Sequence, residues 1–219
     1  MIDPRSVPVV GIDAHLPALE PERLTEMAIR HRFSRPPAWQ PEVRQEPSFT
    51  DRLPQSAAVL MAVILRETPT LLLTERTAHL PTHAGQIAFP GGKVDESDQG
   101  PAHTALREAW EEVGLDPAAV EVLGCLPEYV TGTAFVVTPV VGLVREGHAL
   151  SPNPHEVADA FEVPLAYLMN PANHRRHEWW WEGRQRHWFS MPYQDGLHER
   201  YIWGATAGML RNLYRLLSA

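Results

Sequence analysis

The sequence is poor in the features that mark secreted and membrane proteins. Its one cysteine, Cys125, cannot form a disulfide within the chain, which favours a reducing compartment. No segment has the run of roughly 18 apolar residues that a transmembrane helix needs. The first residues also lack the charged-then-apolar pattern of a secretory signal. We therefore expect a cytoplasmic protein with no membrane partner.

Positive charge is scarce as well. The 219 residues include 19 Lys and Arg against 27 Asp and Glu, a formal net charge of −8 that is spread along the chain. A negative surface argues against a nucleic-acid polymer as partner. It is compatible with a small anionic ligand, because a bound cation or a local basic patch can reverse the field inside a cleft.

The chain does contain alternating strand and helix patterns. Residues 1–55 are predicted to be an N-terminal extension that packs on the domain, with a short helix at Pro21–Arg30 whose face carries Leu24, Met27 and Ala28. Residues 56–219 are predicted to form one domain. Strands are expected at Ser56–Leu65, Thr70–Glu75, Gln86–Phe89, Val120–Leu126 and Thr133–Leu143, a hairpin at Glu178–Phe189, and helices at Gly100–Val113, Glu156–Phe161, Leu165–Met169 and Ala205–Leu217.

This interleaving of strands and helices predicts an α/β layered fold. One residue interrupts the pattern of the long strand at Thr133–Leu143. Pro139 cannot donate a backbone hydrogen bond, so we expect that strand to lie at an edge or to contain a bulge.

Three acidic residues share one side of the helix expected at Gly100–Val113. At about 100° per residue, Glu108, Glu111 and Glu112 fall within roughly a 100° arc. Ionised carboxylates this close repel each other by a few tenths of a kcal/mol per pair. A divalent cation removes that repulsion, and Mg²⁺ and Mn²⁺ prefer oxygen ligands of this kind. From the helix alone, a solvated face in which Arg107 pairs with Glu111 is the commoner interpretation.

The glycines that precede this helix favour metal binding over a solvated helix face. Gly91 and Gly92 end a predicted strand, and glycine allows a backbone to approach another group closely. A strand, a glycine turn, a loop and an acidic helix together make a compact cleft. Bound divalent ions in such a cleft neutralise phosphate charge and lower the pKa of bound water. The pattern therefore predicts a metal platform for phosphate chemistry.

The stretch from Gly92 to Leu115 resembles the Nudix box, G-x5-E-x7-R-E-U-x-E-E-x-G-U. Its second half, from Arg107 onward, matches at every fixed position. In the first half, Asp98 stands where Glu is usual and the spacer has one extra residue. The upstream run from Leu72 to Gly92 is similar to the signature of the coenzyme A pyrophosphatase branch of Nudix proteins, in which a longer spacer with Asp is also typical. The likeness extends from about Ser56 to Leu217.

The resemblance implies a Nudix-type α/β/α sandwich with a mixed sheet, and hydrolysis of coenzyme A or its derivatives with Mg²⁺ or Mn²⁺ as cofactor. The implied products are 3′,5′-ADP and 4′-phosphopantetheine. By analogy, Glu108 and Glu112 are the principal metal ligands, and Glu111 is a further ligand or orients the attacking water. Arg107 is expected to hold the helix through a salt bridge, and the Gly92 carbonyl to complete the metal shell.

Substrate contacts are expected from Arg76, Gln86, Gly91 and Gly92. Arg76 is suited to binding a phosphate in a fork, with a surface salt bridge to Glu75 as the alternative. Gln86, with its neighbour His83, either touches substrate or ties down the loop by hydrogen bonds.

Three further carboxylates are candidates for the base that accepts the proton of the attacking water: Glu128, Glu156 and Glu162. Glu156 is the leading one, and a charge at a helix N-terminus is its more ordinary explanation. The run Trp179–Trp181 alternates faces on a strand, so at least one ring is expected to be exposed. Packing in the core or an interface is favoured over stacking on adenine.

Two other functions remain open at this point. One is a Nudix hydrolase that acts on ADP-ribose or nucleoside triphosphates, and the other is a non-catalytic Nudix-like module that binds a nucleotide and regulates a partner. The intact Arg-Glu-x-x-Glu-Glu pattern favours an enzyme. A homodimer is also left open.

Overall fold

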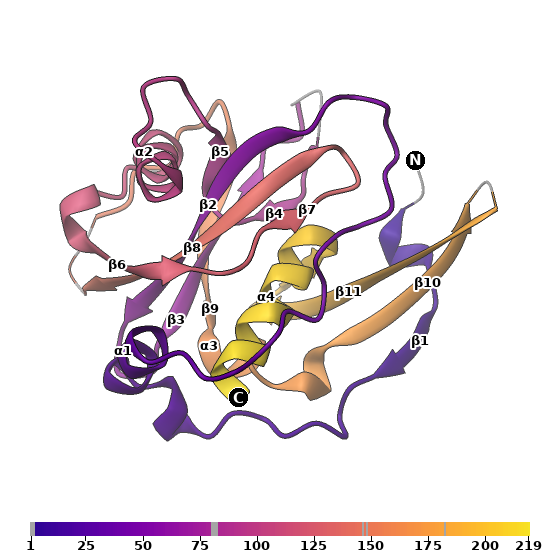
Figure 1. Cartoon of the computed structure of the whole chain (residues 1–219), viewed down its shortest axis with the longest axis horizontal. Helices are drawn as coiled ribbons and strands as arrows, with labels where there is room; N and C mark the ends of the chain where they lie inside the picture. Colours follow the sequence, from indigo (N-terminus) through magenta and orange to yellow (C-terminus); the bar gives the residue numbers. More distant parts are fainter. Residues whose placement is uncertain (1–2, 80–82, 146, 148, 182) are drawn as a thin grey trace.

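A computed structural model describes residues 3–79, 83–145, 147, 149–181 and 183–219 (Figure 1). This part of the chain forms an eight-stranded mixed sheet and a four-stranded antiparallel sheet, with helices packed against both. Residues 80–82, inside the stretch that is similar to the coenzyme A pyrophosphatase signature, lie outside the described residues. So does residue 182, in the turn of the expected hairpin.

The larger sheet is built around two long parallel strands. β2 (Gln55–Leu65) and β8 (Phe135–Arg145) pair along their whole length, and the other pairings between its named strands are antiparallel. On its other side, β2 pairs with β5 near its start and with β3 near its end, so the sheet divides there. The remaining strands are β3 (Thr70–Arg76), β4 (Ile87–Ala88), β5 (Gly91–Lys93), β6 (Val120–Cys125), β7 (Tyr129–Val130) and β9 (Val157–Pro164).

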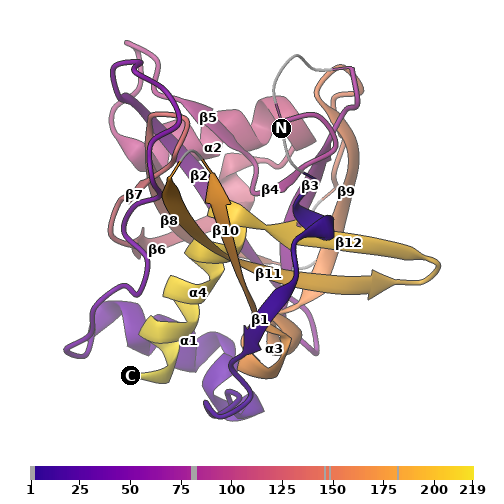
Figure 2. The same ribbon diagram turned by 90° about the vertical axis from the view of Figure 1, so that its right-hand side faces the viewer.

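Both faces of β2 are buried, and each belongs to a different core. Even-numbered residues such as Leu60 and Ile64 pack with α2 (Pro101–Val113), whereas odd-numbered residues such as Met61 and Val63 pack with α4 (Gly204–Ser218). Successive side chains of a strand point to opposite faces, so one continuous apolar run supplies both cores. Figure 2 shows the sheet between these two helices. The fold is therefore an α/β/α sandwich with a mixed sheet, as expected.

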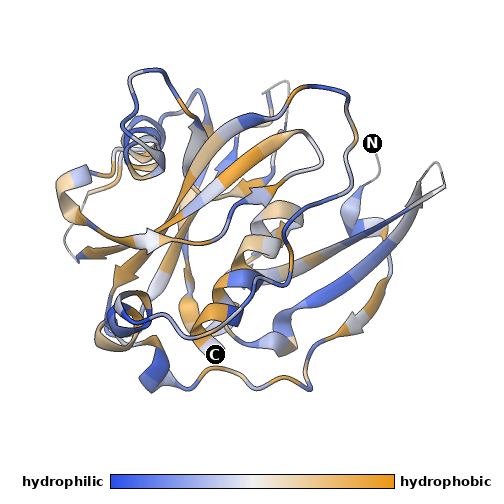
Figure 3. Ribbon diagram, in the orientation of Figure 1, coloured by the Kyte–Doolittle hydropathy of each residue, from blue (hydrophilic) through white to orange (hydrophobic). Residues whose placement is uncertain are grey.

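The smaller sheet covers the outer side of α4. Its strand order is β1-β10-β11-β12, and the buried residues Phe189, Met191 and Ile202 join the same core as α4. Figure 3 shows hydrophilic colour along β10 and hydrophobic colour along β8 and much of α4. The strands are β1 (Val9–Ile12), β10 (Arg175–Trp181), β11 (Arg184–Asp195) and β12 (His198–Trp203), and the other α-helices are α1 (Glu26–Ser34) and α3 (Leu165–Leu168). The antiparallel β10–β11 pair confirms the expected hairpin.

One predicted helix is wrong. Glu156–Phe161 was expected to be helical, but Glu156 lies in a turn and Val157–Pro164 forms strand β9. The buried residues Val157, Phe161 and Val163 all fall on alternate positions, and β9 pairs with β3 along seven residues of register. This long-range pairing outweighs the local helix signal.

Two other expectations need correction. Pro139 lies neither at the sheet edge nor in a bulge of β8, because β2 pairs with β8 on one side and β6 and β7 pair with it on the other. Its carbonyl accepts from Leu126 N at 2.9 Å, on the side of β8 where the pairing with β7 ends and that with β6 begins. The missing N–H therefore removes no hydrogen bond between paired strands. The helix at Pro21–Arg30 is broken, because Thr25 is extended and caps a new helix through Ala28 N. Met27 is consequently 79% exposed, rather than on the packed face.

The helices at Gly100–Val113, Leu165–Met169 and Ala205–Leu217 are confirmed by α2, α3 and α4 within a residue or two. Within the described residues, none of the helices has both the length and the apolar character needed to cross a membrane.

Candidate active site

The acidic helix α2 is held against the sheet by its small apolar residues. Ala105, Ala109 and Val113 are buried against β2, and Pro101 starts the helix where its missing N–H has no helical partner to lose. Gly114 ends it in the left-handed conformation at φ 67°, which glycine adopts without strain. The side of α2 that carries Glu108 and Glu112 adjoins this apolar side and faces β5, where the sheet divides.

Glu112 is the most deeply buried of the three glutamates, at 4% exposure. Its Oε2 accepts a hydrogen bond from Gly91 N at 3.1 Å, and its Oε1 lies 3.6 Å from Nη1 of Arg76. Burial raises the pKa of Glu112 to about 7, although the Gly91 hydrogen bond and the Arg76 charge oppose that rise. A cation beside this carboxylate would favour its ionised form.

Glu108 also lies against β5, beside Gly92. A Cβ atom built on Gly92 would lie 2.4 Å from the carboxyl carbon of Glu108, so the carboxylate occupies the space of the missing side chain. Burial raises the pKa of Glu108, against the influence of Arg107. The charge of Glu108 also contributes to the raised pKa of Glu112, so the two carboxylates face the same space.

Arg107 is fixed by a carboxylate that sequence reasoning did not assign. Its Nε and Nη2 donate to the two oxygens of Asp98 at 3.0 and 2.9 Å, and Nη1 donates to Glu108 at 2.8 Å. Asp98, with no exposed side-chain surface, also accepts from His103, Thr104 and the backbone N of Asp95. The Arg107 hydrogen bonds lower the pKa of Asp98 and raise that of Arg107. The only sequence signal for this role was the place of Asp98 in the Nudix-like pattern.

Glu111 differs from its two neighbours. Its side chain is 55% exposed and lies 3.2 Å from Nη1 of Arg107. Among the described residues, no three His, Cys, Asp or Glu side chains are gathered as a ready metal cage. Two of the predicted ligands, Glu108 and Glu112, are brought together, and Glu111 lies at the solvent side of Arg107.

These residues nevertheless fit a divalent cation. The pair Glu108 and Glu112 is partly desolvated beside a strand that has no side chains at Gly91 and Gly92, which leaves room for close approach to the backbone. Mg²⁺ takes only one or two carboxylates and fills its remaining positions with water and substrate phosphates, so it does not need a full protein cage.

The predicted substrate residues lie around the same division of the sheet. Arg76 ends β3 beside Glu112, and its Nε is buried without a hydrogen-bond partner among the described residues. An unsatisfied buried donor is costly, and an anionic oxygen would satisfy it. Gln86 is half-buried, and its Oε1 lies 2.8 Å from Nδ1 of His83. Its carbonyl accepts from Arg76 N, so Gln86 ties the loop to β3.

The three candidate bases are separated by the fold. Glu156 lies in the turn before β9, and its charge contributes to the raised pKa of both Glu108 and Glu112. No helix follows it, so the alternative explanation as a helix N-terminal charge is wrong. Glu162 binds Arg66 at 2.6 Å near the other end of β9, and Glu128 is exposed after β6. Only Glu156 faces the acidic helix.

The tryptophan run at residues 179–181 lies on β10 of the smaller sheet. Trp180 on β10 is 65% exposed, as the alternation of a strand requires, and Trp179 is partly buried.

Known proteins are similar to this chain over most of its length. The model of the NUDIX domain family matches residues 54–189. A protein from Pectobacterium atrosepticum named "Uncharacterized Nudix hydrolase NudL" is 40% identical over 195 residues, covering 87% of this chain and 92% of its own length. A protein of the same name from Escherichia coli O7:K1 is 43% identical over 161 residues, covering 73% of this chain and 81% of its own.

Solved structures match a smaller part of the chain. An Ap4A hydrolase from C. elegans, in a binary complex, is 20% identical, covers 54% of this chain and 85% of its own, and superposes with a TM-score of 0.44. A Nudix hydrolase from M. smegmatis, RenU, is 26% identical and covers 52% of this chain and 71% of its own, with a TM-score of 0.42.

Proposed function

The chain belongs to the Nudix hydrolase family, and from this premise we propose that it cleaves the diphosphate bond of coenzyme A or its derivatives. The products would be 3′,5′-ADP and 4′-phosphopantetheine or its acyl form. The choice of coenzyme A rests on the run from Leu72 to Gly92, which is similar to the coenzyme A pyrophosphatase signature.

One observation carries the diphosphatase proposal. Glu108 fills the space that a Cβ on Gly92 would need, and Glu112 accepts from Gly91 N, so two carboxylates meet a bare strand at one place. Glu108 and Glu112 would hold a divalent cation there, with Glu111 at the solvent side and the Gly92 carbonyl as a further ligand. When bound, Mg²⁺ or Mn²⁺ would neutralise phosphate charge and activate a water.

The other residues would bind and orient. Arg76, with its unpartnered Nε, would donate to a phosphate oxygen of the substrate. Arg107 is hydrogen-bonded to Asp98. It would keep the carboxylate of Glu108 in position through the 2.8 Å hydrogen bond between Arg107 and Glu108. Glu156 would accept the proton of the attacking water, since its charge faces the acidic helix.

Product analysis in ¹⁸O-labelled water tests this proposal. With coenzyme A and Mg²⁺ or Mn²⁺, we expect the two named products, with the label on one of them, and no product in EDTA until the metal is restored. Mass spectrometry identifies both the substrate and the attacked phosphorus. Turnover of ADP-ribose or nucleoside triphosphates with coenzyme A left intact would contradict the choice of substrate. Nucleotide binding without any metal-dependent hydrolysis would instead indicate a regulatory module.

A further inference from the structure

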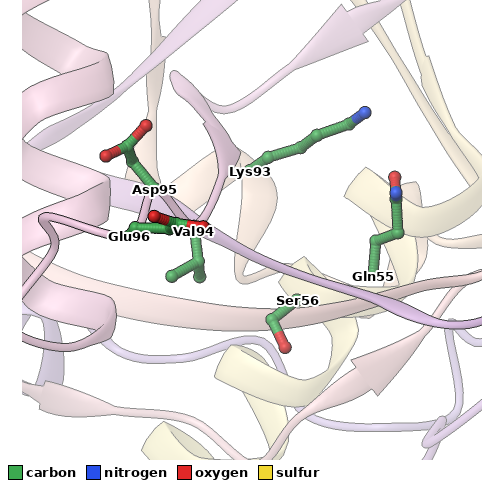
Figure 4. Close-up of a pocket in the computed structure, with 6 residues that line it drawn as sticks. All are labelled: Gln55, Ser56, Lys93, Val94, Asp95 and Glu96. Atoms are coloured by element: carbon green, nitrogen blue, oxygen red, sulfur yellow. The ribbon is translucent and has the colours of Figure 1, made fainter.

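A groove lies beside the proposed site, between residues 52–56, 93–96 and 133–135, and is called here the Lys93 groove. It consists of two adjoining hollows, of about 330 and 430 Å³, that share Gln55 and Lys93. Figure 4 shows the smaller one, in which Lys93 and Gln55 extend to one side and Asp95 points to the other. Gln55 N donates to Ala134 O at 2.9 Å, which joins two walls of the groove.

The larger hollow is basic and has no acidic residue in its lining. Arg52 and Lys93 both line it, and neither side chain forms an ion pair or hydrogen bond with the described residues. This is unusual in a chain of net charge −8, where buried or half-buried arginines such as Arg200 and Arg211 bind carboxylates. The acidic residues of the groove, Asp95 and Glu96, line only the smaller hollow. An anion is therefore attracted to the Arg52 and Lys93 end.

The same hollow offers an apolar surface. The half-buried ring of Phe135 forms one wall, with Nζ of Lys93 5.8 Å from its centroid, and Leu53 is 85% exposed at the rim. A flat aromatic face beside two free cations is suited to a ligand that combines a planar base with a phosphate.

The groove lies within reach of the proposed reaction site. Lys93 follows Gly91 by two residues on β5, about 7 Å along an extended strand. Its carbonyl accepts from Nη2 of Arg107 at 3.1 Å, so the strand that carries Lys93 is bound directly to the acidic helix. Gly92 faces Glu108, so Lys93, the next residue of β5, points to the opposite face of the strand. A nucleotide whose diphosphate lies at Gly91 and Gly92 would pass the edge of β5 to reach the groove.

We propose that the Lys93 groove binds the phosphate monoester on the nucleoside end of the substrate, away from the bond that is cut. The inference rests on the proposed function and adds a reason for selecting a nucleotide with a 3′-phosphate over one without it. Lys93 and Arg52 would bind that phosphate, and Phe135 would contact the nucleoside.

Coenzyme A and dephospho-coenzyme A, which differ only in the 3′-phosphate, provide the kinetic test. We expect the wild type to favour coenzyme A in kcat/KM. Lys93→Met and Arg52→Met should each lower the ratio of the two kcat/KM values by roughly tenfold, the effect of losing one charge-assisted contact. Lys93→Arg should retain most of the preference. Arg145→Met removes a charge at the other end of β8 and should leave the ratio unchanged.

Calorimetric titration with 3′,5′-ADP and 5′-AMP tests the groove without turnover. Tighter binding of 3′,5′-ADP by the wild type, lost in Lys93→Met, supports the inference. Equal affinities for the two nucleotides, or a variant that weakens both alike, would overturn it even if coenzyme A is hydrolysed. If 3′,5′-ADP binds through Lys93 and neither coenzyme is cleaved, the proposed function fails and the groove assignment stands.

Discussion

The carboxyl group of Glu112 is buried, yet its only hydrogen-bond donor in the described residues is the neutral N–H of Gly91, with Arg76 at 3.6 Å. Glu112→Gln keeps the shape and an oxygen for Gly91, so the fold should be retained. It removes the negative charge that would hold the cation. We expect kcat to fall by at least about a hundredfold, as for damage to a catalytic metal site. Steady-state kinetics, with manganese titration by calorimetry, measures both effects, and near wild-type turnover would refute the metal assignment.

Asp98 is expected to affect the reaction indirectly, because it contacts Arg107 and not the proposed metal site. Asp98→Asn replaces one acceptor oxygen with a donor that faces Arg107. The guanidinium therefore loses one of its two hydrogen bonds to residue 98. We expect kcat to fall roughly tenfold, as for a residue that positions a ligand, with little change in KM. Asp116→Asn is a matched control, since Asn still caps the turn at Pro117. Equal kinetics for both variants would show that Asp98 is only structural.

At the scale of single residues, the sequence predicted which acidic residues share a side of the helix, but not how differently they are buried. The spacing of Glu108, Glu111 and Glu112 places them on one side of a helix, which the structure retains. It could not predict that Glu112 is buried and Glu111 exposed, because that depends on how α2 sits over β5. The five donors around Asp98 come from a loop and two helix turns, so no local pattern reveals them.

The two glycines of strand β5 leave no room for a side chain, and substitutions at the two positions should have different effects. A Cβ at Gly92 meets the carboxyl end of the Glu108 side chain at 2.4 Å, whereas one at Gly91 meets the backbone oxygen of Ala58 at 2.5 Å. Gly92→Ala should therefore displace the Glu108 carboxylate, and Gly91→Ala should push β5 away from β2. We expect Gly92→Ala to lose activity and manganese binding with a stability change below about 1 kcal/mol, and Gly91→Ala to lose about 1–3 kcal/mol.

Urea unfolding and manganese titration of the two variants separate these effects. Alanine variants with equal stability and equal metal affinity would contradict the assigned contacts. Gly85→Ala is not a suitable control, because its φ of 67° strains any other residue. Gly11→Ala is suitable, since a Cβ there meets nothing within 4 Å and its φ is not left-handed.

Other elements explain where sequence prediction succeeds and fails. Helices α2 and α4 were predicted almost to their ends, because proline, glycine and a 3.6-residue apolar period all act locally. Strand β9 was predicted as a helix since its decisive partner, β3, lies more than eighty residues earlier in the chain. Pro139 is tolerated in a central strand because it lies opposite the gap between β6 and β7. That gap depends on long-range pairing, which the local sequence does not reveal.

The whole molecule is joined by a buried charged network that links the first fifty residues to the last helix. Arg211 on α4 is 1% exposed and binds Asp13 at 3.0 Å and Glu42 at 2.7 Å, both from the N-terminal segment. Its Nη1 also donates to Nδ1 of His174 at 3.0 Å. The predicted boundary near residue 55 stays a prediction. Loss of these two carboxylates alone would leave the Arg211 charge buried without its partners, which typically costs about 3–5 kcal/mol.

His174 makes this network sensitive to acid. Its Nε2 donates to Leu168 O at 2.7 Å, and its Nδ1 is occupied by Arg211, so the buried ring fits the network only when neutral. Burial lowers the pKa of His174 to about 4, with the Arg211 charge acting in the same direction, from 6.5 in the unfolded chain. Between these values the unfolded chain binds more protons than the folded one. The stabilisation is therefore complete above pH 6.5 and is lost as the pH falls from 6.5 toward 4.

Urea unfolding across that pH range checks this expectation. The wild type should lose about 2–3 kcal/mol of unfolding free energy through His174 in addition to the general effect of acid. His174→Gln can still donate to Leu168 O but cannot become charged, so it should be less stable at neutral pH and fall less steeply with acid. His198→Gln, at an exposed histidine, should retain the wild-type slope. Parallel curves for the wild type and His174→Gln would mean that the pKa of His174 is close to its ordinary value, and that the charge network tolerates a protonated ring.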